Sequence, residues 1–180
     1  MKIYSKLEIQ NILKQGNSLS DKEGSLVLDK FQENQPDIYH AIFGIFCQEI
    51  SEINEDMGNL FIDLCFDIMW FYRSEVGDLP KIDTKTSNEY LKGIDMEIKS
   101  TSDEFPMDQD FRNFLKTRFI KTAQEDDFQM ELLYYLNEAI VKYVSFNRDR
   151  KCAESFTRNM IFIIIRYMDK LSNMDRSRIK

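Results

Sequence analysis

The chain has 180 residues and a mass of 21.5 kDa, enough for one domain around a single apolar core and too short for a second domain of ordinary size. Hydrophobic residues make up 43% and charged residues 31%, as in globular proteins, and six glycines and three prolines are too few for a turn-rich β-sandwich or barrel. The formal charge of −7 disfavours nucleic acid as a general partner, because the molecule as a whole repels polyanions.

Strong start signals predict three helices in the N-terminal part. Ser5 can cap a helix that runs to about residue 15 and stops at Gly16. Ser20 and Glu23 have the spacing of a capping box, in which each side chain satisfies a free backbone N–H, and they open a helix to about residue 34. Pro36 suits the first turn of a third helix, where its missing N–H would have no partner.

The third and fourth predicted helices form a long apolar pair. In the third helix, spacings of 4, 3, 4 and 3 residues place one apolar stripe over Tyr39, Phe43, Phe46, Ile50 and Ile53. Asn54 begins a fourth helix that runs to about Val76 and is apolar on nearly every side. We expect such a helix at the centre of a bundle.

Gly77 and Pro80 end the fourth helix, and residues 79–86 are predicted to be an internal linker. Weaker helical patterns follow at about 87–99 and around Phe111, Phe114, Leu115 and Phe119. The acidic run 125–127 is expected to open another helix, and residues 147–150 form a polar corner before the last long one. That last helix is predicted to reach about Leu171 and to leave a frayed basic tail at 172–180.

These patterns predict the fold class. No run of alternating residues between turn signals indicates a strand, and the short polar connections favour antiparallel neighbours. We therefore expect one domain over residues 1–180, an all-α bundle of seven or eight mostly antiparallel helices.

The sequence also predicts the compartment. Cys47, Cys65 and Cys152 are widely spaced and lie in apolar runs, which favours buried thiols in a reducing environment over a disulfide framework. Lys6 and Glu8 interrupt the start of the chain where a signal peptide would need apolar residues, and no apolar segment is long enough to span a membrane. A cytoplasmic protein without membrane association is the expectation.

Several kinds of catalytic site are disfavoured. His40 is the single histidine, so zinc sites with paired histidines and di-iron sites with Glu-x-x-His pairs have no ligands. No Gly-rich phosphate loop and no Gly-x-Ser-x-Gly elbow occurs. An interpretation as a P-loop enzyme, a Rossmann enzyme or a serine hydrolase is therefore not supported.

Carboxylates remain as candidates for chemistry. Glu49 and Glu52 are neighbours on the third helix, and Asp63 and Asp67 are neighbours on the fourth. A turn at Asn54 would bring Glu52 near Asp56 and cluster acids at one end of the pair. Oxygen ligands of this kind suit Mg²⁺. The candidate metal ligands are Glu49, Glu52, Asp56 and Asp63, and the reading that depends on them is an Mg²⁺-dependent nucleotide phosphohydrolase.

One spacing resembles a known signature. Glu49-x-x-Glu52, followed after 22 residues by Glu75-x-x-Asp78, is similar to the Glu-x-x-Glu and Glu-x-x-Asp pattern of the all-α MazG-type nucleotide pyrophosphohydrolases, which implies Mg²⁺ ligands that hydrolyse nucleoside triphosphates. The resemblance covers about a sixth of the chain. Gly77 and Pro80, however, end the helix where that family needs both acids of the second pair inside one, so we do not assign the chain to the family.

The last helix predicts a partner surface instead. Its apolar face is continuous, and Arg158 and Lys151 lie on the opposite, basic face. Phe162 and Ile165 project into that basic face, so either other helices surround this helix or part of it contacts a partner. We therefore expect a non-catalytic interaction or regulatory protein without a cofactor, which binds another protein or associates with itself.

The charge distribution leaves a narrower alternative. Residues 141–180 contain 10 basic and 4 acidic residues, whereas residues 1–90 contain 8 basic and 16 acidic ones. Local contact with nucleic acid through Arg148, Arg150, Lys151 and Arg158 is the third hypothesis, and the net charge opposes it.

Overall fold

The computed structural model describes residues 2–101, 107–124 and 129–178. It is 86% helical, and the described residues contain no strand, so the all-α prediction is confirmed. The elements are α1 (Lys6–Gly16), α2 (Asp21–Asn34), α3 (Pro36–His40), η1 (Ala41–Phe46), α4 (Cys47–Ile53), α5 (Glu55–Val76), α6 (Thr84–Thr101), α7 (Gln109–Gln124), α8 (Met130–Ser145), η2 (Arg148–Arg150) and α9 (Lys151–Arg178). Because α3, η1 and α4 are continuous, the described part of the chain forms eight helices.

The predicted start signals act as expected. The hydroxyls of Ser5 and Ser20 each accept a hydrogen bond from the backbone N–H three residues on. In turn, the carboxylates of Glu8 and Glu23 accept the backbone N–H of the same serines, so both capping boxes are complete. Pro36 occupies the first turn of α3. Local sequence therefore determines where the first three helices begin.

A π-helical segment changes the register of the third helix. The backbone N–H of Cys47 donates to the carbonyl of Ile42, five residues back, in place of the usual four. The extra residue rotates the following turns, so the buried line runs through Ile38, Ile42 and Ile50. Of the predicted stripe, Ile50 is buried and Tyr39, Phe43 and Phe46 pack half-buried against the core, whereas Ile53 at its end is exposed.

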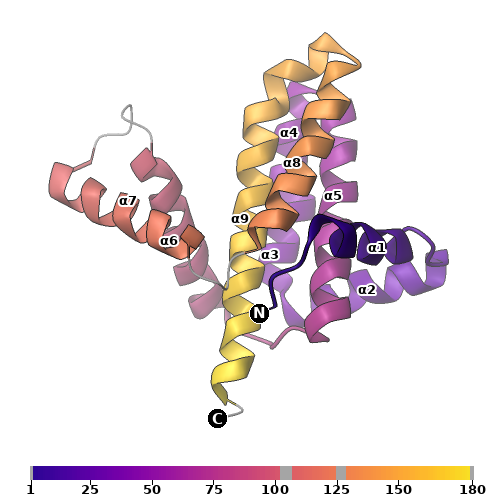
Figure 1. Ribbon diagram of the computed structural model, residues 1–180, viewed down its shortest axis with the longest axis horizontal. Helices are drawn as coiled ribbons and strands as arrows, with labels where there is room; N and C mark the ends of the chain where they lie inside the picture. The colour runs from indigo at the N-terminus through magenta and orange to yellow at the C-terminus, as the bar shows by residue number, and fades with distance from the viewer. Residues whose placement is uncertain (1, 102–106, 125–128, 179–180) are drawn as a thin grey trace.

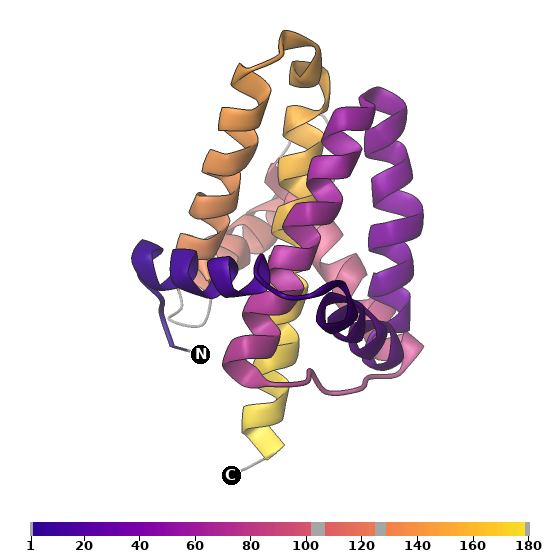
Figure 2. The same ribbon diagram turned by 90° about the vertical axis from the view of Figure 1, so that its right-hand side faces the viewer.

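Two helix hairpins form the main body of the molecule (Figures 1 and 2). In the first, α3 to α4 pairs with α5 around Asn54, and in the second, α8 pairs with α9 around Asn147. Each asparagine side chain accepts a backbone N–H of the helix that follows, at 3.0 Å in both turns. The two turns lie side by side at the top of Figure 1, where Arg150 joins them through an ion pair with Asp56.

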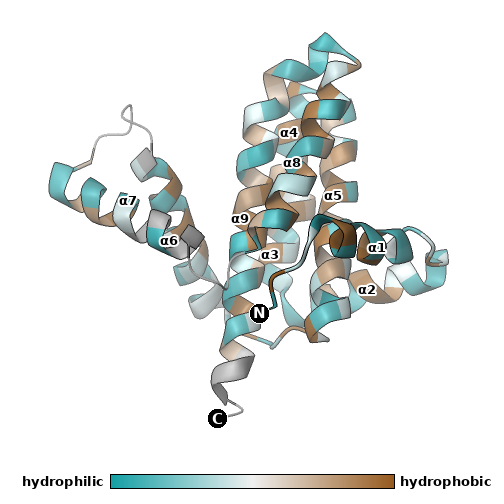
Figure 3. Cartoon of the chain, viewed as in Figure 1, coloured by the Kyte–Doolittle hydropathy of each residue, from teal (hydrophilic) through white to brown (hydrophobic). Residues whose placement is uncertain are grey.

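The centre of the bundle is made by α5 and α9, which pack on each other and on most of the other helices. Phe61, Ile68 and Tyr72 of α5 and Ile161, Ile164 and Tyr167 of α9 are completely removed from water. Figure 3 shows apolar turns where these two helices pass through the middle of the molecule. The last helix is therefore covered by other helices over part of its surface: Ile165 is completely buried, whereas Phe162 is half-buried.

Helices α6 and α7 form an arm that stands away from the two hairpins on the left of Figure 1. The arm is attached through α6, which packs on α9 and α3, whereas α7 packs mainly on α6. The contacts to α9 include a buried ion pair between Glu97 and Arg166 at 3.0 Å and a hydrogen bond between Ser87 and Tyr167 at 2.9 Å. The arm is therefore fixed at its base and exposed at its far end.

Some helix boundaries differ from the predicted ones. The linker is shorter than predicted, because Asp83 accepts hydrogen bonds from the Thr86 N–H and hydroxyl and α6 already begins at Thr84. The last helix continues to Arg178 instead of ending near residue 171, since Ser172 is buried and Met174 contacts the hydroxyl of Tyr90. The acidic run 125–127 lies outside the described residues.

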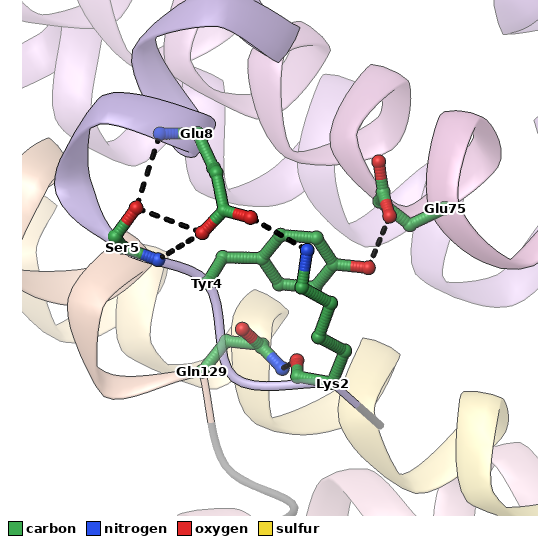
Figure 4. Close-up of polar contacts among 6 residues, drawn as sticks. All are labelled: Lys2, Tyr4, Ser5, Glu8, Glu75 and Gln129. Carbon is green, nitrogen blue, oxygen red and sulfur yellow. Dashed lines mark hydrogen bonds and ion pairs between the residues drawn. The ribbon is translucent and has the colours of Figure 1, made fainter.

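The N-terminal segment is anchored to the bundle before α1 begins (Figure 4). The ring of Tyr4 packs edge-on against Phe71 at 5.2 Å, and its hydroxyl donates to Glu75. The side-chain amide of Gln129 donates to the carbonyl of Lys2 at 2.9 Å. Among the described residues, no helix combines the length and apolar character needed to cross a membrane.

Candidate functional site

A groove runs between the upper half of α9, the facing side of α8 and the arm. It has a volume of about 350 Å³, within the lower part of the size range of ligand pockets. Among the residues that the structure describes, its lining comes from three helices: Ile98 of α6, Leu133 and Asn137 of α8, and Lys151, Glu154, Ser155, Arg158, Asn159 and Phe162 of α9. The groove is therefore built from segments that are far apart in the sequence.

One rim of the groove is charged. Glu154 is 8% exposed and forms two ion pairs within α9. One is with Lys151, three residues before it, and the other is with Arg158, four residues after it, at 3.7 Å. Arg158 also donates to the side chain of Asn137 across the groove, at 3.1 Å. Two cations around one carboxylate leave this rim with a net positive charge.

The groove also has an apolar part. Phe162 is half-buried between α9 and the other helices, and Leu133 and Ile98 lie beside it in the lining. Apolar surface with a few fixed polar groups around it is the usual composition of a site that binds a ligand or a peptide.

The structure divides the predicted partner-surface residues. Phe162, Arg158 and Lys151 all line the groove. Ile165 lies in the core with an exposed fraction of 0%, and its carbonyl accepts a hydrogen bond from the hydroxyl of Tyr72 of α5 at 3.3 Å. Three of the four residues thus share one surface, and Ile165 stabilises the bundle from inside.

The four predicted metal ligands have different surroundings. Glu49 and Glu52 are exposed on α4, and Glu52 accepts a hydrogen bond from Gln48 at 3.0 Å. Asp56 accepts two hydrogen bonds from Arg150, at 2.7 and 3.0 Å, and Asp63 is exposed on α5. No group of three or more potential metal ligands occurs among residues whose positions the structure describes.

The second acidic pair of the pyrophosphohydrolase-like spacing is split by the end of a helix. Glu75 lies in the last turn of α5, and Gly77, with φ of 80°, ends that helix before Asp78. Since α5 rises about 1.5 Å per residue, Glu75 lies roughly 30 Å along the axis from the turn that holds Glu52. Glu75 instead accepts the hydroxyl of Tyr4.

The remaining predicted groups have separate surroundings. His40 is exposed, Cys47 is half-buried beside Ser51 at 3.9 Å, and burial raises the pKa of the Cys65 thiol. The prediction of three buried thiols is therefore right only for Cys65, since Cys47 is half-buried and Cys152, in the first turn of α9 at the tip of the hairpin, is exposed. In the basic cluster, Arg150 points inward to Asp56 and the carbonyl of Tyr143, and Arg148 is exposed.

Buried polar residues are the feature that sequence reasoning missed. Burial raises the pKa of Asp169 to about 7, although hydrogen bonds from the Tyr72 hydroxyl and the Gln129 N–H oppose the rise. Arg166 and Glu97 form the buried ion pair between α9 and the arm. A signal was present, because Arg166 and Asp169 follow directly on the apolar run 160–165 of the last helix, where a buried polar group needs a partner.

Comparison with protein-family models, with curated protein sequences and with solved structures finds no match.

Proposed function

We propose that this chain is a non-catalytic interaction protein that binds a partner protein in the groove between α6, α8 and α9. The observation that supports the proposal is the composition of the groove: an apolar part around Phe162 and Leu133 lies beside a net positive rim of Lys151, Glu154 and Arg158. An acidic segment with apolar side chains would fit both parts at once.

The compartment belongs to the same proposal. Cys47, Cys65 and Cys152 are free thiols, and the exposed one, Cys152, would oxidise most readily outside a reducing environment. We therefore propose that the interaction takes place in the cytoplasm. We regard the protein as regulatory because it would hold the partner without changing it chemically.

Site-specific photocrosslinking in cells tests the proposal. A photoreactive amino acid replaces Asn159, an exposed lining residue, and the control carries it at Gln48, which is exposed on α4 outside the groove. We expect a discrete crosslinked adduct of defined mass from position 159 and none from position 48. Arg158→Glu, which reverses a rim charge, should reduce the yield from position 159.

Two outcomes would overturn the proposal. Equal adduct yields from both positions would mean nonspecific encounter, and the absence of any intermolecular adduct from position 159 would mean that the groove binds no protein. Circular dichroism of each variant verifies that it keeps the helical fold.

A further inference from the structure

The far end of the arm carries an unusual exposed surface. Phe111 and Phe114 stack with ring centroids 6.5 Å apart and an interplanar angle of 19°, and they remain 45% and 59% exposed. Single exposed apolar residues are common, but a stacked aromatic pair on a projecting helix leaves a contiguous apolar surface in water. Two exposed aromatic rings on one projecting helix are the kind of side chains that anchor a helix in a partner's groove.

Acidic residues accompany the aromatic pair. Asp108 caps α7 by accepting the N–H of Phe111 at 3.0 Å, and Asp110 is exposed in the first turn. Negative charge is favourable at this end of a helix because of the helix dipole. We call the surface formed by Asp108, Asp110, Phe111 and Phe114 the arm tip.

The arm tip and the groove are complementary. The tip offers two aromatic rings beside two carboxylates, and the groove offers apolar side chains beside Lys151 and Arg158. Phe111 and Phe114 are three residues apart on one helix, the spacing with which helices usually place anchors in apolar grooves. Opposite charges at the rim would fix the orientation of the docked helix and favour its association.

We infer that the partner of the groove is a second copy of this chain, whose arm tip it binds. Each copy carries one arm tip and one groove, so a reciprocal exchange between two copies uses both surfaces of each and closes with two-fold symmetry. The inference rests on the proposed function, because it names the protein that occupies the groove. It also gives the projecting arm a role.

Light scattering and sedimentation of the purified protein test the inference. We expect a dimer that dissociates on dilution and in high salt, since charge pairs at the rim are screened by salt. Phe114→Ser in the arm tip and Arg158→Glu in the groove should each weaken dimerisation by about tenfold or more. Circular dichroism and thermal melting verify that both variants remain folded.

A charge exchange makes the test specific for this pairing. Asp110→Arg alone should weaken the dimer, because its arm tip would meet the groove cations of the other copy. In the double variant with Arg158→Glu, the new positive charge at position 110 would meet the new negative charge at position 158, so dimerisation should return to within a few fold of the wild type. Asp21→Arg, a first-turn acid of α2 that is also exposed, is the matched control and should not restore the Arg158→Glu variant.

A wild type that is monomeric at its highest soluble concentration would overturn the inference, as would a dimer indifferent to these substitutions. The crosslinking at position 159 keeps the two proposals distinguishable. An adduct with a different protein would leave the proposed function standing while this inference fails. An adduct whose mass is that of two copies would support both.

Discussion

The hydroxyl of Tyr72 donates a 2.6 Å hydrogen bond to the carboxylate of Asp169, joining α5 to α9 in the interior of the bundle. The other oxygen of Asp169 accepts the N–H of Gln129 at 3.2 Å, and the side chain of Gln129 holds the carbonyl of Lys2. One buried carboxyl group therefore connects the two central helices, the start of α8 and the N-terminal segment.

This carboxyl group should make stability depend on pH. Burial raises the pKa of Asp169 to about 7 in the folded protein, whereas an unfolded aspartate titrates near 4. The folded state thus binds the proton more tightly, so its contribution to stability is complete below about pH 4 and is lost as the pH rises through about 7. We expect the free energy of unfolding to fall across this window, by an amount on the order of a few kcal/mol.

Urea titrations at several pH values measure this effect. Asp169→Asn cannot titrate, so its free energy of unfolding should vary less with pH than that of the wild type. Asp67, whose pKa burial and the nearby Asp63 raise to about 7, contributes in the same direction and should account for part of the remaining slope. Asp21→Asn, at an exposed site, serves as the control; an Asp169→Asn profile parallel to the wild type would contradict the prediction.

Gly16 is required by the position of Trp70. The indole N–H donates to the carbonyl of Ile12 at 2.9 Å, and a Cβ at position 16 would lie 2.6 Å from the Cδ1 atom of Trp70. Gly16→Ala should therefore destabilise the protein by about 1–3 kcal/mol, because a ring packed against a helix cannot yield as a flexible side chain would. Fluorescence of Trp70, the single tryptophan, reports the unfolding.

Gly24→Ala is the matched control for this substitution. Its Cβ would meet the Phe66 ring at 3.8 Å, an ordinary contact, and alanine favours the helix, so stability should stay the same or rise by up to about 1 kcal/mol. If Gly16→Ala were as stable as Gly24→Ala, the packing of Trp70 on α1 would not have the described geometry.

Arg150 joins the turns of the two hairpins through several contacts at once. Its guanidinium donates to Asp56 at 2.7 Å and to the carbonyl of Tyr143 at 3.0 Å, and it lies 3.8 Å from the centroid of the Tyr143 ring. Lysine cannot reproduce this arrangement, so Arg150→Lys should cost about 1–3 kcal/mol. Hydrogen exchange should accelerate first at both turns, around 54–57 and 147–151.

Arg148→Lys, at an exposed position in the same turn, should change neither stability nor exchange appreciably. An equal response of both variants would show that positive charge alone, without the planar geometry of arginine, is sufficient at this corner.

Ile165 and Phe162 should differ in stability cost although they are three residues apart. Ile165→Ala removes side-chain atoms from a fully buried site, which typically costs about 2–5 kcal/mol. Phe162 lines the groove, where water can replace the ring in Phe162→Ala, so this substitution should lower the free energy of unfolding by less. Chemical denaturation compares the two, and a larger loss for Phe162→Ala would mean that the groove is closed to water.

Divalent cations should have little effect on stability. Because Glu49, Glu52 and Asp63 are exposed and Asp56 is paired with Arg150, we expect millimolar Mg²⁺ or Mn²⁺ to leave the melting temperature nearly unchanged. A rise that Glu52→Gln abolishes would support the phosphohydrolase reading instead, and nucleotide hydrolysis would then be the next measurement.

The starts of the helices were predictable from the sequence, whereas the register within the third helix was not. Ser5, Ser20, Asn54 and Asn147 mark helix starts correctly because each cap is satisfied within three residues. The π-helical segment Ala41–Phe46 was not predictable from spacing, because the spacing argument assumes the regular four-residue hydrogen bonds of an α-helix.

The sequence by itself determined the helical class, the turns at Asn54 and Asn147, and the central position of α5 and α9, because these follow from local hydrogen bonds and from apolar periodicity. Only the tertiary structure decided that Phe162 lines a groove while Ile165 is buried, and that Asp169 lies in the interior with partners. The reason is physical: burial and pKa depend on which helices pack over a turn, and those helices come from distant parts of the chain.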